Sequence, residues 1–204
     1  AFDTIPFAND GTHINGPTIL PAGQVAAALS FDGVDDYVEV PDAANNTLDL
    51  TIGNFAVDTT GWTAGGVIPD LYTARGGAVS PPIRWTTVPA DAVELALVFR
   101  DVDADVTRGD QDVLWIVSGL DPALLGFAEG TIPPTADLYL ASTPDYDYFG
   151  PDTPPGETHT FTLTLYALRA PLAVDRLLPA ADVVAAIEAQ SFTNASYSGI
   201  MIGR

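Results

Sequence analysis

The chain has 204 residues, of which 27 are Asp or Glu and seven are Lys or Arg, so its formal net charge is -20. Nucleic acids and anionic membrane surfaces are excluded as partners, because binding them requires a basic surface. Hydrophobic residues make up 47% of the chain, which is enough for a sizeable core, and the absence of Cys excludes disulfides and thiolate chemistry.

Residues 1–24 predict an extended arm that is apolar and carries only two charges, on Asp3 and Asp10. We expect this arm to add a strand to a sheet of a neighbouring copy, so that the chain self-associates head to tail. The alternative left open is that the arm folds back as an edge strand of its own sheet. The apolar side chains of the arm are those of Phe2, Ile5, Phe7, Ile14, Ile19 and Leu20.

Alternating residues 25–31, the dipeptide Asp32-Gly33 and residues 37–40 together predict a β-hairpin, because Asp-Gly favours a tight two-residue turn. Residues 28–50 resemble the opening strands of laminin-G-like jelly rolls. That fold needs two full sheets, so no lectin function follows from this short segment. We therefore divide the chain into an arm with a hairpin, residues 1–54, and a main domain, residues 55–204.

The main domain is predicted to be rich in strands. Residues 93–100 and 160–168 alternate between apolar and polar side chains, and residues 113–117 (VLWIV) indicate a central strand covered on both faces. After Pro179, residues 180–190 predict an amphipathic helix, and the end of the chain predicts a last strand. The predicted fold class is all-β: an antiparallel β-sandwich with one C-terminal helix and an N-terminal β-arm and hairpin.

Four blocks of the main domain follow one another in a recognisable order. They are GGVIPDLYTARGGAVSPPIRW, ELALVFRDVDA, GPDTPPGETHTFTLTLYAL and AAIEAQSFTNASYSGIMIGR. From about residue 55 to residue 204 the chain resembles the phosphatidylethanolamine-binding protein family, in its bacterial Raf kinase inhibitor-like branch. The resemblance implies a sandwich of two antiparallel sheets with a small anion pocket at one end.

The residual pocket implied by this resemblance has lost several of the family's polar groups. Leu114 replaces a histidine, Thr160 replaces an arginine, and Phe161 replaces a tyrosine. A phosphate site needs hydrogen-bond donors and positive charge, so we expect no appreciable binding of phosphate or phosphorylethanolamine. The pocket residues that remain are Asp101, Asp103, Pro154, Pro155 and His159.

A second candidate site is a calcium loop formed by carboxylates at alternate positions. Calcium prefers several oxygen ligands that converge from such a loop. The sixth loop position is Val106 where a calcium loop has glycine, and a solvated acidic loop is the alternative. Apart from calcium, no cofactor is expected. The four candidate ligands are Asp101, Asp103, Asp105 and Asp112.

These features predict a protein without enzymatic activity, because no nucleophile and base pair is visible. The main expectation is a secreted structural or assembly module, a filament or matrix subunit joined by its N-terminal strand. The alternative is an inhibitor-like module that binds a small ligand or a protein through the residual pocket. No apolar run is long enough to span a membrane. The start at Ala1 and the absence of Lys favour an extracellular or periplasmic location.

Overall fold

A computed structural model describes residues 54–109, 111–142 and 147–204, together with the backbone of four short strands nearer the N-terminus. The chain divides into two compact units, Ala1–Thr51 and Ile52–Arg204. Among the described residues, no helix combines the length and the apolar character needed to cross a membrane.

The first unit contains two pairs of antiparallel strands. Strand β1 (Thr12–Ile14) pairs with β4 (Tyr37–Glu39), and β2 (Thr18–Leu20) pairs with β3 (Ala28–Ser30). The predicted hairpin between residues 25–31 and 37–40 is therefore wrong in its pairing. Phe2, Ile5 and Phe7 of the arm lie outside the described residues, as does the Asp32-Gly33 turn.

The strands of the predicted arm therefore find their partners within the same unit. Pairing with a nearby segment closes only a short loop, so it costs less chain entropy than capture of another molecule. The expected strand addition to a neighbouring copy receives no support from this arrangement.

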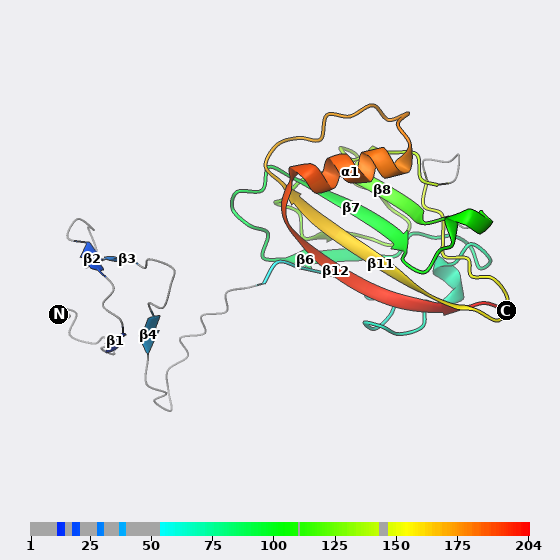
Figure 1. The fold of residues 1–204 in the computed structure, drawn as a ribbon, viewed down its shortest axis with the longest axis horizontal. Helices are drawn as coiled ribbons and strands as arrows, with labels where there is room; N and C mark the ends of the chain where they lie inside the picture. Colours follow the sequence, from blue (N-terminus) through cyan, green and yellow to red (C-terminus); the bar gives the residue numbers. More distant parts are fainter. Residues whose placement is uncertain are drawn as a thin grey trace. The chain divides into compact units, whose positions relative to one another are not determined.

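The second unit is built on two antiparallel sheets and one α-helix, as Figure 1 shows. The order of the larger sheet is β10 (Asp137–Leu138), β8 (Val113–Leu120), β7 (Glu94–Asp101), β11 (Thr158–Leu168) and β12 (Ser191–Ile202). The smaller sheet contains β5 (Ala56–Asp58), β6 (Ile83–Thr86) and β9 (Gly126–Phe127). The helices are α1 (Ala180–Gln190) and the 3-10 turns η1 (Asp70–Tyr72) and η2 (Val106–Arg108). The predicted antiparallel strands and C-terminal helix are confirmed.

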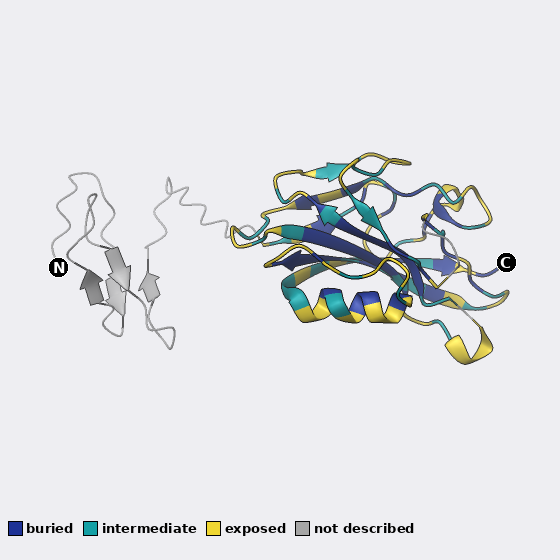
Figure 2. Ribbon diagram, turned by 90° about the horizontal axis from the view of Figure 1, so that it is seen from above, coloured by how far each residue is buried: buried dark blue, intermediate teal, exposed yellow. Residues whose placement is uncertain are grey.

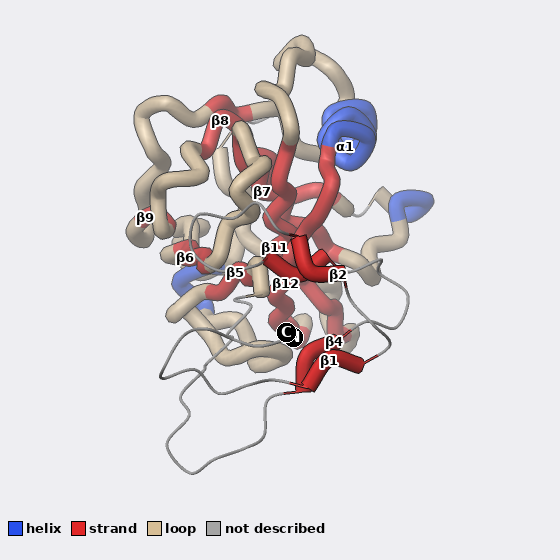
Figure 3. Tube along the Cα trace, turned by 90° about the vertical axis from the view of Figure 1, so that its left-hand side faces the viewer, coloured by secondary structure: helices blue, strands red, loops and turns tan. Residues whose placement is uncertain are grey.

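The large sheet is covered on both faces along its central strands (Figures 2 and 3). On one face, Leu97 and Phe99 of β7 pack in a core with Trp85 of β6. On the other face, Val98 packs in a second core with Val183 of α1. Because strand residues alternate between faces, this double cover explains why both sets of β7 side chains are apolar.

Strand β12 forms an edge of the large sheet, and a loop covers part of that edge. The Gly65 amide donates to the Ser198 carbonyl at 2.9 Å, and the Ile68 amide donates to the Ile200 carbonyl at 2.8 Å. The Ile200 amide donates to the Gly66 carbonyl, also at 2.8 Å. These bonds satisfy backbone groups that an uncovered edge would expose.

At one end of the large sheet, the end of β7 lies beside the start of β11, where Asp101 is opposite Phe161. A proline-rich turn leads into β11, and the Glu157 amide donates to the Pro154 carbonyl at 3.1 Å. The end of the chain packs against this turn, because the Gly203 amide donates to the Glu157 carbonyl at 2.9 Å. A Cβ on Gly203 would lie 1.8 Å from the Pro154 carbonyl oxygen, so this position admits only glycine.

Candidate binding site

A buried ion pair joins the two strands at this end of the sheet. His159 Nδ1 lies 2.7 Å from Asp101 Oδ2, and the side chains are 4% and 3% exposed. The other oxygen of Asp101 accepts the Asp103 amide at 2.9 Å, and Asp103 accepts the Thr160 amide at 2.7 Å. The structure thus places three of the predicted pocket residues, Asp101, Asp103 and His159, in one network.

The network continues to two residues that the sequence analysis missed. His159 Nε2 donates to Glu157 Oε2 at 3.1 Å, and Arg108 donates to both Glu157 oxygens at 3.0 and 3.2 Å. Hydrogen bonds from Arg108 and then from His159 lower the pKa of Glu157 to about 2. The sequence did contain a signal for Glu157. It stands two residues before His159, and residues i and i+2 entering a strand share a face.

His159 therefore lies between two carboxylates. Burial alone would lower its pKa, but the hydrogen bonds and charges of Asp101 and Glu157 outweigh burial, and the pKa is raised. An imidazole that donates from both ring nitrogens carries two protons and a positive charge. At this site the protein stabilises an imidazolium ion.

We expect the His159 ring to titrate in an NMR experiment above the ordinary histidine value of about 6.5. Glu157→Gln should move the midpoint down, because one of the two carboxylates that stabilise the imidazolium is lost. The stabilisation from His159 should be complete below the unfolded pKa and disappear as pH rises through the raised folded pKa. The signal is assigned by its loss in His159→Gln. An unchanged midpoint in Glu157→Gln would show that Glu157 does not stabilise the imidazolium.

A cavity of about 250 Å³ is lined by several residues that are close in sequence to members of this network. Gly109 and Gln111 follow Arg108, and Pro154 precedes Glu157. Leu114, which is buried, occupies the position where the family resemblance implies a histidine. Arg75 and Asp152 form an ion pair at 2.8 Å, and Gln111 Oε1 is buried without a hydrogen-bond partner among the described residues. The lining consists of Arg75, Gly109, Gln111, Leu114, Phe149, Asp152 and Pro154. Of the predicted pocket residues, Pro154 lines this cavity and the other four do not.

The loop that carries Phe149 is held by hydrogen bonds at both sides. The Phe149 amide donates to the Leu114 carbonyl at 3.1 Å, and the Tyr148 hydroxyl donates to the Tyr72 carbonyl at 2.7 Å. A Cβ on Gly150 would lie 2.5 Å from the same Tyr72 carbonyl oxygen. This close approach fixes one wall of the cavity against the loop that carries Arg75.

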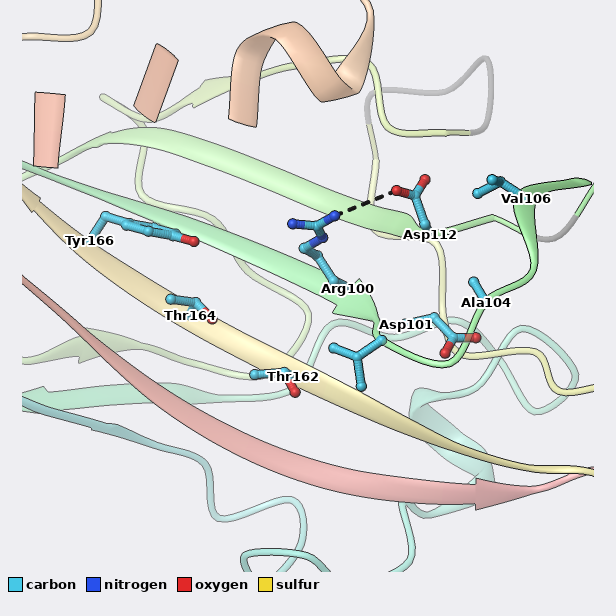
Figure 4. A pocket seen from close by; sticks show the side chains of 9 residues that line it. Arg100, Asp101, Ala104, Val106, Asp112, Thr162, Thr164 and Tyr166 are labelled. Carbon is cyan, nitrogen blue, oxygen red and sulfur yellow. Dashed lines mark ion pairs between the residues drawn. The ribbon is translucent and has the colours of Figure 1, made fainter. Parts of the chain in front are cut away.

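A third feature is a polar groove of about 430 Å³, on the face of the large sheet that also carries α1 (Figure 4). Thr162, Thr164 and Tyr166 project along β11, beside Arg100 of β7. Arg100 Nη2 lies 3.6 Å from Asp112 Oδ2. No side chain that lines this groove has a buried polar atom without a partner among the described residues, whereas Gln111 of the cavity does, so the cavity is the better candidate for a ligand.

The structure does not bring the four predicted calcium ligands together. Asp101 and Asp103 belong to the His159 network, Asp105 binds Thr107 and Arg108, and Asp112 accepts the Ser142 hydroxyl. Within residues 54–109, 111–142 and 147–204, no three His, Asp or Glu side chains form a group that could hold a metal ion. Each of the four carboxylates is bound to a donor of its own. Their alternate spacing in the sequence therefore does not bring them together as a cluster of metal ligands.

We expect the melting temperature to be the same in calcium and in a chelator at matched ionic strength. A bound ion would raise the melting temperature by an amount that grows with the ratio of free calcium to its dissociation constant. Differential scanning calorimetry in both buffers measures this directly. A reproducible drop on chelation, removed by Asp103→Asn, would restore the calcium loop as the explanation.

The sequence profile described as phosphatidylethanolamine-binding protein matches residues 58–202. The chain belongs to the phosphatidylethanolamine-binding protein family. A relative in Mycobacterium tuberculosis, LppC, whose name describes it as a candidate lipoprotein, is 40% identical over 126 residues. That match covers 61% of this chain and 59% of LppC, so the chain spans less than two thirds of that relative. A UPF0098 protein of Methanothermobacter thermautotrophicus is 31% identical over 141 residues, which cover 66% of this chain and 90% of the relative.

Two crystal structures of phosphatidylethanolamine-binding protein relatives superpose on the chain. CT736 of Chlamydia trachomatis, described as a candidate homologue of the family, has a TM-score of 0.64 and 26% identity, with 72% of this chain and 95% of that chain covered. YbcL of E. coli, described as a new member of the mammalian family, has a TM-score of 0.68 and 20% identity and shows the shared fold. The superposition covers 74% of this chain and 99% of the YbcL chain.

The prediction of a secreted filament or matrix subunit is wrong. The matched residues 58–202, together with the relatives, place the main domain in a family named for binding a ligand, and the YbcL structure shows the same fold. The alternative prediction, a ligand-binding or inhibitor-like module, agrees better with these findings.

Proposed function

We propose that this chain is a non-enzymatic binding module that holds a small ligand in the cavity beside Leu114. The observation that carries this proposal is the buried Gln111 Oε1, which has no partner among the described residues. Buried polar atoms are nearly always hydrogen-bonded, so an unpaired acceptor on a side chain that lines a cavity favours a ligand that donates to it. Leu114, Phe149 and Pro154 supply the apolar contact that such pockets use for affinity.

The chemistry of the lining favours a neutral ligand over a phosphate. The Leu114 side chain has no hydrogen-bond donor, and the charge of Arg75 is balanced by Asp152. The volume of about 250 Å³ suits a small molecule or the end of a larger one. We therefore expect an apolar group carrying a hydroxyl or amide donor, and the expectation that phosphate and phosphorylethanolamine do not bind is retained.

We also propose an envelope or extracellular location. The support is the name of LppC, which describes a candidate lipoprotein and shares 40% identity with this chain over 126 residues. The strongly acidic composition is compatible with that setting.

The proposal is tested by NMR titration of the full chain with benzyl alcohol as the probe. Resonances of Gln111, Leu114 and Phe149 should shift together. Leu114→Trp should abolish the shifts by filling the cavity, and Gln111→Ala should weaken binding without a change in the fold. Leu177→Trp is the matched control, because Leu177 is 71% exposed and a Trp there adds the same side chain outside the cavity. Shifts that persist in Leu114→Trp, or that never reach these three residues, would refute the cavity as the binding site.

A further inference from the structure

The polar groove on the α1 face of the large sheet begins where the cover of the helix ends (Figure 4). On β7, Val98 is buried in the core beside α1, whereas Arg100, the next residue on the same face, is 39% exposed. On β11, Tyr166 is buried, whereas Thr164 and Thr162 are partly exposed. Both strands therefore change from buried to accessible side chains at the same place, and the accessible part is polar.

The side chains of this groove have hydrogen-bonding capacity that the protein does not use. Arg100 presents several N–H donors, and the oxygen of its ion-pair partner Asp112 is 3.6 Å away, which is too long for a hydrogen bond. The Thr162 hydroxyl, on the residue opposite Arg100 in the sheet, forms no hydrogen bond with the described residues. Thr164 shares one hydrogen bond with Ser196 at 3.0 Å, which leaves each hydroxyl further capacity. In an open groove such groups bind water, which a ligand with matching hydroxyls replaces at little cost.

The charges of the groove balance one another. Arg100 is paired with Asp112. Asp101 also lines the groove, and its carboxylate is paired with the buried His159. An anion is disfavoured further by the net charge of -20, and the part of the chain that the structure describes holds no cluster of metal ligands. The ligand that fits therefore carries many donors and acceptors but no charge, and the hydroxyls of a sugar have this property.

The polar surface is elongated along β11. Thr162, Thr164 and Tyr166 project from alternate positions on one face, and at about 3.4 Å per residue they span roughly 14 Å. Tyr166 also lines a second hollow of about 290 Å³ with Glu188 of α1 and Asn194 of β12. A line of polar groups of this length matches an extended ligand better than a compact one. Glycans with β-linkages of the cellulose and chitin type form extended chains, whereas α-linked chains of the amylose type coil.

We propose that this groove binds a neutral, extended, β-linked oligosaccharide, and that Arg100, Thr162 and Thr164 supply the hydrogen bonds that hold it. The site is separate from the cavity beside Leu114, because Leu114 packs in the core on one face of the sheet and Tyr166 packs in the core on the other. The oligosaccharide site therefore does not depend on the ligand proposed for that cavity.

The test is an NMR titration of the full chain with cellotetraose and with chitotetraose as separate arms. At least one of them should shift the resonances of Arg100, Thr162 and Tyr166 together and leave those of Gln111 and Leu114 in place. Because the ligand is neutral, its affinity should not change with ionic strength. Thr162→Val removes one hydroxyl and keeps the shape of the side chain, so it should weaken binding about fivefold. Arg100→Met, which keeps the stem and removes the donors, should also weaken binding.

The matched control is Thr86→Val, the same change at an exposed position of β6 in the smaller sheet, and it should bind as the full chain does. Maltotetraose should bind more weakly than the β-linked sugars, and equal affinity would contradict recognition of an extended chain. The proposal is overturned if neither β-linked sugar binds, or if binding is unchanged in both Thr162→Val and Arg100→Met. Shifts in the groove that appear only with a lysine oligomer and disappear in salt would assign the groove to a cationic ligand instead.

Discussion

Trp115→Ala should lower the free energy of unfolding by about 3–5 kcal/mol, the usual cost of removing a large aromatic side chain from a core. Trp115 is completely buried at the centre of β8. Its ring meets Tyr148 edge-on at 5.3 Å and Phe127 at 5.9 Å. Urea denaturation followed by far-ultraviolet circular dichroism measures the change.

The control for this substitution is Trp115→Phe. The indole Nε1 of Trp115 is buried and has no hydrogen-bond partner in the part of the chain that the structure describes. Phenylalanine removes that unpaired donor while it keeps much of the ring, so the net loss should stay below about 1.5 kcal/mol. A loss as large as that of Trp115→Ala would show that the indole is stabilised by something other than packing.

Asp101→Ala should destabilise the protein by about 3 kcal/mol or more, because removing one partner of a buried ion pair leaves the other charge uncompensated. His159 would remain buried without its Nδ1 partner, and the Asp103 amide would lose the oxygen that it binds at 2.9 Å. Urea denaturation provides the stability, and the NMR titration of His159 should show a lower midpoint than in the full chain.

Asp58→Ala is the matched control, because the pair between Arg84 and Asp58 is 3.1 Å long but its side chains are 58% and 46% exposed. Exposed pairs contribute about 0–1 kcal/mol, so this variant should be nearly as stable as the full chain. If Asp101→Ala were no more costly than Asp58→Ala, the buried pair would not be a source of stability.

Local periodicity was sufficient to predict the strands and the helix of the main domain. Residues 160–168 and 180–190 carry their patterns in neighbouring side chains, and each became the element expected. Pairing in the first unit was not predictable in the same way. The Asp32-Gly33 signal is local, whereas the partners of β3 and β4 lie in earlier segments that this signal does not report.

Residues of the candidate site could be predicted only where each, taken singly, matched a motif of the family that the chain resembles. Asp101 and His159 were found in this way, and the structure places them in contact. Arg108 was missed because it reaches Glu157 from 49 residues away, and no spacing rule covers that distance. The calcium prediction receives no support from the described residues, because alternate spacing does not say where side chains point. Asp105 turns back to bind its own loop.

The covered part of the β12 edge bears on how this protein behaves when it is concentrated. Gly65, Gly66 and Ile68 already occupy the backbone groups of Ser198 and Ile200. Amyloid-like growth needs a free row of such groups to act as a template, and this stretch offers none. Together with mutual repulsion from a net charge of -20, the covered stretch favours colloidal stability over aggregation.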